Sequence, residues 1–193
     1  MKIHLVRHGK TDANEKGLYC GNTDLPLLES GAIEIAQLKQ QGVYPTAEMF
    51  FTSGLIRAGQ TLTIICGNVR RKAIPDMSEF KFGTFEMKSH FELKDRDDYI
   101  AWVTDETGEV HCPDGESKRS FEKRVLKGYR YIVDALRESD KSSALVVCHG
   151  GVIIIIMEYL FPDTKNFFEW QPVPGRGYTI EFDTDLPITF CNI

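Results

Sequence analysis

The spacing of hydrophobic and polar residues predicts a chain in which strands alternate with helices. Runs typical of short strands occupy residues 2–6, 49–51, 70–74 and 144–148, and a hairpin-like pair occupies residues 178–182 and 188–190. Apolar residues recur three and four positions apart, as on one face of a helix, over residues 30–42, 55–66 and 117–138. Such alternation predicts right-handed β-α-β crossovers. The predicted fold is therefore α/β, a three-layer sandwich in which helices flank a mostly parallel central sheet.

Two stretches carry competing signals. Residues 152–160 include four consecutive isoleucines, which favour a strand by intrinsic propensity. However, the Gly150-Gly151 pair directly after a buried strand is typical of a strand-to-helix turn, so we predict a helix there. Residues 80–116 are charged and aromatic, with few strand-like runs. We expect this segment to leave the main layers as a mainly helical excursion, with a helix around residues 89–103.

The composition is that of an ordinary globular protein, and it limits the classes of partner. The chain has 193 residues and no linker or internal repeat, so we expect a single domain over residues 1–193. A net charge of −5 without a basic run argues against nucleic acid or a membrane surface as partner. A few local arginines can still bind a small anion. The five cysteines form no C-x-x-C pair and suggest reduced thiols, so we expect a cytoplasmic protein.

Residues whose side chains or backbone N–H groups can bind an anion follow three of the predicted strands. They are Arg7, His8, Thr11 and Asn14 after the first strand, Arg57 after the second, and His149 and Gly150 after the buried strand at 144–148. Because ligands bind beyond the carboxyl ends of parallel strands, these residues mark the place to look for chemistry. Two imidazoles, two guanidinium groups and the N–H groups of helix N-termini would suit a phosphoryl group.

Simpler roles for these residues compete with a phosphoryl site. A histidine at a strand end is often a hydrogen-bonded structural residue, and a single helical arginine is often solvated. Metal binding by the histidines is disfavoured, because no His or Cys pair has ligand spacing and the arginines would repel a cation, so we expect no metal. The chain contains no glycine-rich nucleotide-binding loop and no serine nucleophile elbow.

Six segments, in order, resemble the motifs of the histidine phosphatase superfamily, in its phosphoglycerate-mutase-like branch (branch 1). They are LVRHGKTDAN (5–14), GNTDLPL (21–27), TSGLIRAGQT (52–61), Glu79 with FGTFE (82–86), PDGES (113–117) and HGG (149–151). An isolated R-H-G triplet would be weak evidence. The ordered set, which spans residues 3–152, is far more specific.

This resemblance implies a role for each matched residue. His8 would be the nucleophile that forms a phosphohistidine, with its other ring nitrogen donating to a backbone carbonyl. Arg7, Arg57 and His149 would hold the phosphoryl oxygens, and Glu79 would be the proton donor. Further residues expected to line the substrate site are Thr11, Asn14, Cys20, Gly21 and Gly150. The resemblance implies neither a metal nor another cofactor.

Three motif positions are expected to support the site rather than to react. Glu86 would fix a loop. Glu116 and Ser117 would cap the long helix or orient the arginines. Met87 follows Glu86 where the family more often has glycine.

The resemblance implies a metal-independent phosphatase that acts on small-molecule phosphate esters. A phosphoglycerate mutase is the alternative, and a phosphate-recognising module without catalysis is a third hypothesis. Only residues 80–112 separate Glu79 from Pro113. Mutases of the family carry a longer insertion at this place, so the resemblance favours the phosphatase. The run YCGNTD (19–24) resembles the α-ribazole phosphatase subgroup. Specificity is expected from residues 80–112, with Phe82, Tyr99 and Trp102 as candidates.

Overall fold

A six-stranded sheet forms the centre of the structure, a computed structural model in which residues 1–183 and 186–193 are described. Its strands are β1 (Lys2–Arg7), β2 (Met49–Thr52), β3 (Lys72–Ala73), β4 (Ser143–Cys148), β5 (Gly177–Asp183) and β6 (Leu186–Asn192). They lie in the order β3-β2-β4-β1-β5-β6. The strands β3, β2, β4 and β1 run parallel to one another, whereas β5 pairs antiparallel with both β1 and β6.

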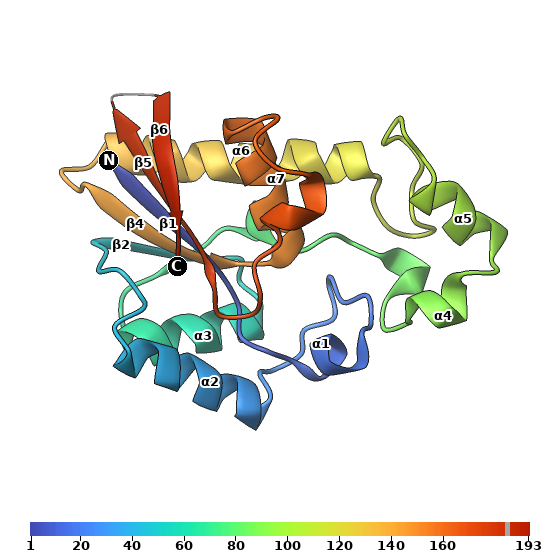
Figure 1. Cartoon of the computed structure of the whole chain (residues 1–193), viewed down its shortest axis with the longest axis horizontal. Helices are drawn as coiled ribbons and strands as arrows, with labels where there is room; N and C mark the ends of the chain where they lie inside the picture. Colours follow the sequence, from blue (N-terminus) through green and yellow to red (C-terminus); the bar gives the residue numbers. More distant parts are fainter. Residues whose placement is uncertain (184–185) are drawn as a thin grey trace.

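Helices cover both faces of this sheet (Figure 1). They are α1 (Asp12–Lys16), α2 (Glu29–Gln40), α3 (Ile56–Cys66), α4 (His90–Leu93), α5 (Asp97–Val103), α6 (Lys118–Arg137) and α7 (Gly150–Leu160), with short 3₁₀ turns η1 (Pro75–Met77), η2 (Gly83–Phe85) and η3 (Phe167–Trp170). In Figure 1, α2 and α3 lie below the sheet and α6 and α7 lie above it. The predicted three-layer α/β fold is confirmed.

Strand β4 is buried on both faces because a helical layer covers each side. Ala144, Val146 and Cys148 belong to the core shared with α6 and α7, whereas Leu145 and Val147 belong to the core shared with α2 and α3. The apolar side of α6 supplies the largest share of the first core: Phe121, Val125, Tyr129, Ile132 and Leu136 are all buried. The continuous apolar sequence of β4 is therefore what a central parallel strand requires.

The structure refines several sequence predictions at the level of single elements. The isoleucine-rich segment is helical, as predicted. The strand expected at residues 70–74 shrinks to the two residues of β3 at the edge of the sheet. The prediction of a single helix around residues 89–103 is wrong, because two separate helices, α4 and α5, occupy this stretch. The Ser89 and Glu92 side chains form a capping box that starts α4, a short-range signal that the prediction did not use.

The excursion from the main layers is closed at its base by backbone contacts. The Thr84 N–H donates to the Pro113 carbonyl at 2.8 Å, and the Glu116 N–H donates to the Lys81 carbonyl at 3.0 Å. Gly83 has a φ of 55°, and a Cβ there would lie 2.0 Å from the Pro113 carbonyl oxygen, so only glycine fits. Beyond this base, α4 and α5 project to one side of the molecule (Figure 1).

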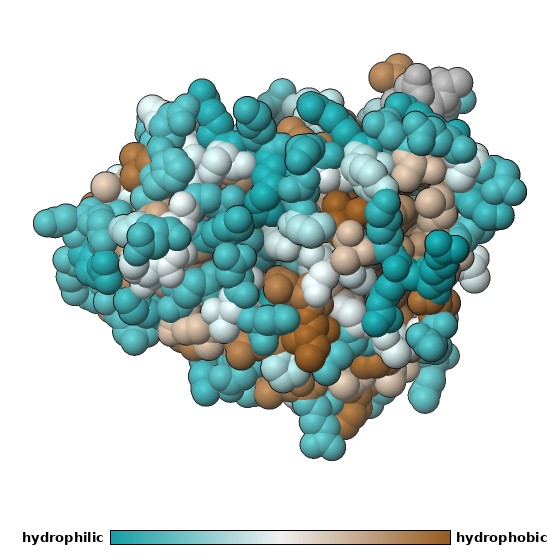
Figure 2. Space-filling model, turned by 180° about the vertical axis from the view of Figure 1, so that it is seen from behind, coloured by the Kyte–Doolittle hydropathy of each residue, from teal (hydrophilic) through white to brown (hydrophobic). Residues whose placement is uncertain are grey.

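The surface is mainly hydrophilic (Figure 2), as expected from a composition with 26% charged residues. Hydrophilic residues dominate the face in Figure 2, and hydrophobic ones form small patches between them. Over residues 1–183 and 186–193, no helix combines the length and the hydrophobicity needed to span a membrane.

Two isoleucines of α2 offer a direct test of the core packed beneath it. Ile35 is 1% exposed, whereas Ile33 on the same helix is 51% exposed. We expect Ile35→Ala to lower the free energy of unfolding by about 2–5 kcal/mol, because it leaves a cavity. Ile33→Ala should change it by less than about 0.5 kcal/mol. Urea denaturation followed by circular dichroism measures both, and equal effects would contradict the packing described.

Candidate active site

The register between β1 and β4 brings the two histidines together. Arg7 pairs with Cys148 in this parallel ladder, so the next residues, His8 and His149, leave the two strands side by side. The His8 N–H donates to the Cys148 carbonyl at 3.0 Å. The two rings meet edge to face with their centroids 5.0 Å apart. After β1 the chain crosses toward β2, and after β4 it crosses toward β5, so the histidines lie where the connections diverge.

The tautomer of His8 is set by its own loop. Its Nδ1 atom lies 2.7 Å from the Gly9 carbonyl oxygen, which can only accept a hydrogen bond. Nδ1 therefore carries the proton, and Nε2 is left with a free lone pair. The predicted hydrogen bond to a backbone carbonyl is confirmed. Burial lowers the pKa of His8 to about 3, with the charges of Arg57 and Arg7 acting in the same direction.

His149 is fully buried and is oriented by Ser53 at the end of β2. Its Nε2 atom lies 2.8 Å from the Ser53 Oγ atom. The Leu55 N–H also donates to that oxygen, so Ser53 links the ring of His149 to the start of α3. Burial, with smaller effects of His8 and the arginines, holds the pKa of His149 well below its usual range. Nδ1 is buried and has no hydrogen-bond partner among the described residues.

Arg57 lies in the first turn of α3 and is 1% exposed. Its Nη1 and Nη2 atoms donate to the carbonyls of Thr23 and Gly21, both at 2.8 Å. The Glu86 carboxylate holds this loop from the other side, because it accepts from the Gly21 N–H at 3.0 Å and from the Thr23 hydroxyl at 2.9 Å. The predicted loop-fixing role of Glu86 is confirmed.

Arg7 ends β1 beside the first turn of α7. Its Nη1 atom donates to the Pro172 carbonyl at 2.8 Å, and its Nε atom is buried without a partner in the described part of the chain. A Cβ on Gly150 would lie 3.4 Å from the Arg7 Cζ atom, which places this guanidinium against the start of α7. Burial lowers the pKa of Arg7, and the charge of Glu79 opposes that shift.

The Glu79 carboxylate also lies at the N-terminus of α7. Its Oε2 atom accepts from the Gly151 N–H at 3.0 Å, and its Oε1 atom accepts from the Phe80 N–H at 2.9 Å. A Cβ on Gly151 would lie 2.5 Å from Oε1, so the second glycine of the pair is what lets the carboxylate approach. The positive end of the helix dipole faces this negative group.

The comparison with known sequences identifies the family. The sequence model of the histidine phosphatase superfamily (branch 1) matches residues 3–187. The chain belongs to this superfamily. It is 33% identical over 164 residues to an adenosylcobalamin/alpha-ribazole phosphatase of Salmonella typhimurium, across 83% of this chain and 79% of that protein. It is also 28% identical over 199 residues to a 2,3-bisphosphoglycerate-dependent phosphoglycerate mutase of Beijerinckia indica, across 96% of this chain and 89% of that one.

Solved structures of phosphatases also share the fold of this histidine phosphatase. The crystal structure of an alpha-ribazole phosphatase from Shigella flexneri superposes with a TM-score of 0.81 at 26% identity, covering 97% of this chain and 93% of that one. The predictions of the family, of its fold and of a phosphatase are thereby confirmed.

Of the remaining predicted site residues, Thr11, Asn14 and Cys20 hydrogen-bond within their own segments, whereas Gly21 bonds to other segments. The Thr11 N–H and hydroxyl both donate to the Asn14 Oδ1 atom at 3.0 Å, and so they start α1. The Cys20 thiol lies 3.5 Å from the Thr23 carbonyl, and burial raises its pKa. Gly21 contributes to the histidine phosphatase site through the carbonyl that accepts from Arg57. Among residues 1–183 and 186–193, no group of three or more His, Cys, Asp or Glu side chains is placed to hold a metal ion.

Two supporting residues were missed by sequence reasoning. Thr61 accepts from the Gly9 N–H at 2.9 Å and donates to the Arg57 carbonyl at 2.8 Å, so it ties the loop after β1 to α3. Its position four residues after Arg57, on the same side of the helix, was the available signal. Arg124 lies on α6 and donates to backbone carbonyls near Glu79. Nothing in the sequence marked it, because the polar side of α6 carries many charged residues.

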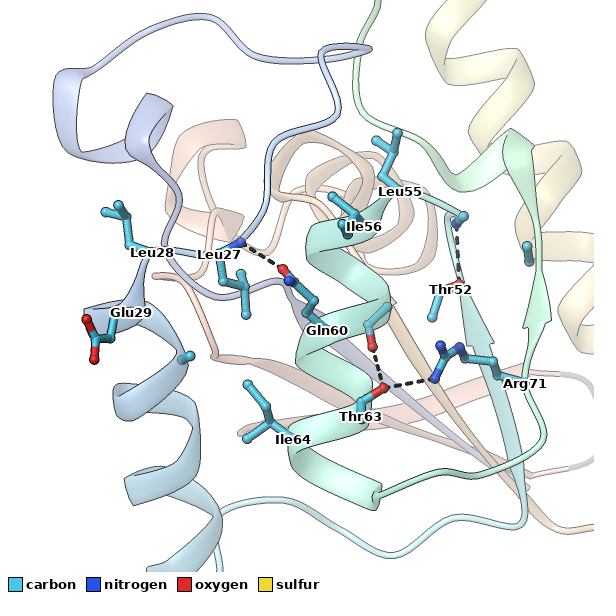
Figure 3. Close-up of a pocket in the computed structure, with 14 residues that line it drawn as sticks. Leu27, Leu28, Glu29, Thr52, Leu55, Ile56, Gln60, Thr63, Ile64 and Arg71 are labelled. Carbon is cyan, nitrogen blue, oxygen red and sulfur yellow. Dashed lines mark hydrogen bonds between the residues drawn. The ribbon is translucent and has the colours of Figure 1, made fainter.

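A separate hollow of about 690 Å³ lies beside α3, and none of the predicted site residues lines it. Figure 3 shows that its wall comes from the start of α2, the outer side of α3 and the β2–β3 edge. Its polar groups bond to one another: Arg71 Nη1 donates to the Thr63 hydroxyl at 2.9 Å (Figure 3). The two histidines of the phosphatase site lie elsewhere.

The depressed pKa values of the buried histidines predict acid sensitivity. The unfolded chain takes up a proton on His8 near pH 6.5, whereas the folded chain does so only near pH 3. Protonation therefore favours the unfolded state, and stability falls as the pH drops from about 6.5. We expect His8→Asn to reduce this slope by up to about 1.4 kcal/mol per pH unit.

Urea denaturation at pH 7 and pH 5 in buffer without phosphate measures the effect. Identical slopes for His8→Asn and the wild type would show that His8 does not resist protonation in the fold.

Proposed function

We propose that this histidine phosphatase hydrolyses small-molecule phosphate monoesters without a metal ion, through a phosphohistidine at Nε2 of His8. One observation carries the proposal. A buried imidazole with a free Nε2 lone pair directly follows Arg7, and its ring centroid lies 5.0 Å from that of His149. The Arg7 Nε and His149 Nδ1 atoms are buried and have no hydrogen-bond partner among the described residues. Buried polar atoms are rarely left unpaired in a folded protein, and a bound phosphoryl group is the partner that we propose for both.

In the first chemical step, the Nε2 lone pair of His8 attacks phosphorus, and the bond from phosphorus to the leaving oxygen breaks. Protonated Glu79 gives its proton to that oxygen, so the product leaves as an alcohol. Arg7, Arg57 and His149 donate to the phosphoryl oxygens, where negative charge is spread in the transition state.

In the second step, water attacks the phosphohistidine. The Glu79 carboxylate takes a proton from the water, the P–N bond breaks, and His8 returns to its neutral form. The hydrogen bond from Nδ1 to the Gly9 carbonyl supports both steps, because it keeps the proton off Nε2. Glu79 ends the cycle with the proton that it needs for the next leaving group.

For the substrate, we propose a phosphate ester of the α-ribazole phosphate type. The similarity to alpha-ribazole phosphatases supports this choice. Tyr19 precedes the loop that holds Arg57, and its ring lies 4.9 Å from that of Phe82, with both residues half-buried. These two rings could stack on a flat group of the ester. Tyr99 and Trp102 are buried and pack the excursion instead.

A phosphoglycerate mutase is the second candidate, because the chain is similar to the mutase from Beijerinckia indica. A mutase would return the phosphoryl group to a bound product instead of to water. The higher identity to the Salmonella phosphatase, 33% against 28%, favours hydrolysis. We further propose a cytoplasmic location, since the five cysteines are free thiols.

The first test is hydrolysis of a chromogenic phosphate ester and of α-ribazole phosphate in the presence of a chelator. We expect turnover to persist with chelator and to be abolished in His8→Ala, because Nε2 is the nucleophile. Acid quenching should trap an acid-labile, alkali-stable phosphoryl group on His8. Turnover that needs added metal or survives His8→Ala would refute the mechanism. Conversion of 3- to 2-phosphoglycerate primed by bisphosphoglycerate, at a rate above hydrolysis, would favour the mutase.

The second test concerns the proton donor. We expect Glu79→Gln to lower kcat by about 10²–10⁴-fold on alkyl phosphates, because the amide cannot protonate the leaving oxygen. Glu109→Gln is the matched control, since the Glu109 carboxylate is 58% exposed and pairs with Arg119 on the excursion side. An unchanged rate in that variant would remove Glu79 from the mechanism.

A further inference from the structure

We infer that Arg124 and Glu116 form a clamp that positions Glu79, and that this clamp sets how well the enzyme expels a poor leaving group. The inference rests on the proposed role of Glu79 as proton donor. Arg124 and Glu116 touch neither histidine through a hydrogen bond, so they are positioning residues and not catalytic ones.

One side of the clamp is the guanidinium of Arg124. Nη1 donates to the carbonyls of Asp76 and Ser78 at 3.0 and 2.9 Å, and Nη2 donates to the Glu79 carbonyl at 3.2 Å. Three carbonyls within four consecutive residues thus accept from one side chain. Only arginine offers a planar fork of several fixed donors.

The other side of the clamp is the carboxylate of Glu116. It pairs with Arg124 through Nη2–Oε1 and Nε–Oε2 contacts of 2.5 and 3.2 Å. Its Oε1 atom also accepts from the Lys81 N–H at 2.9 Å. The backbone is therefore held before Glu79 by Arg124 and after it by Glu116. The two side chains are only 15% and 10% exposed, so their contacts are shielded from water.

The segment between these contacts is neither helix nor strand. The turn η1 ends at Met77 and η2 begins at Gly83, so Glu79 lies on irregular backbone. Its carboxylate is held by two N–H groups, one of them from its neighbour Phe80. A misplacement of about 1 Å in a reacting group can cost roughly 10²-fold in rate. The clamp joins Glu79 to α6, which is packed against the same core as β1 and β4.

The experiment compares variants on two esters that differ in how much they need a proton donor. 2,4-Dinitrophenyl phosphate has a leaving group that departs without protonation, whereas glycerol phosphate has one that needs it. Arg124→Lys keeps the positive charge beside Glu116, but one ammonium group cannot reproduce the fork to the three carbonyls. Glu116→Gln keeps the shape but removes the charge. Arg119→Lys is the matched control on the same helix, at an exposed ion pair with Glu109.

We expect Arg124→Lys to lower kcat/KM, which reports only the formation of the phosphohistidine, by at least about tenfold on glycerol phosphate, with less than about threefold change on the dinitrophenyl ester. Glu116→Gln should shift kcat/KM in the same direction on the same ester. Arg119→Lys should match the wild type on both esters. Thermal melts establish that each variant is folded.

Two outcomes would overturn the inference: wild-type rates of Arg124→Lys on both esters, or an equal loss on both esters, which indicates a general structural role. Glu79→Gln, measured beside them, separates this inference from the proposed function. If Glu79→Gln is slow only on glycerol phosphate and Arg124→Lys is not, the clamp alone is refuted. If Glu79→Gln lowers kcat/KM equally on the two esters, the proton-donor role in the first step is refuted, and the clamp inference with it.

Discussion

The parallel pairing of β1 with β4 is the constraint on which the site depends. A shift of one residue would move His8 away from His149 and would also turn the side chains of β1 to the opposite faces of the sheet. Such a slip is costly because both faces are covered, so Ile3 and Leu5 would leave one core and Val6 the other. The hydrophobic packing of the two layers therefore determines a catalytic distance.

Burial of positive charge is the second physical theme. Arg57 is almost completely buried, and both of its terminal nitrogens bond to backbone carbonyls. Carbonyl dipoles orient a guanidinium without cancelling its charge, so the pocket stays electropositive. A carboxylate partner would have stabilised the arginine more strongly but would also have repelled a phosphoryl group. The carboxylate of Glu86 instead accepts from the N–H of Gly21, whose carbonyl in turn accepts from Arg57.

Much of the fold could be predicted from the sequence because it depends on local patterns. The apolar run of β4, the stripe of α6 and the Gly150-Gly151 turn each predict one element directly. The candidate residues Arg7, His8, Arg57 and His149 followed from their positions after predicted strands, whereas Glu79 came from the family resemblance. What escaped prediction was the supporting layer: Arg124 and Thr61 act through backbone carbonyls and N–H groups distant in sequence, and such bonds leave no periodicity. The short helix α1 and the break between α4 and α5 escaped for a related reason, since a few residues give too little pattern.

The closed base of the excursion has a consequence for how this framework can vary. Because residues 81–84 and 113–116 are held together by their own backbone, the segment carrying α4 and α5 is attached as a side loop whose ends scarcely move apart. Lengthening or replacing that loop costs little in chain entropy. The part of this segment after Glu86 could therefore be exchanged for another, which would alter which ester is admitted, provided that the Glu86 carboxylate stays to hold the loop around Arg57.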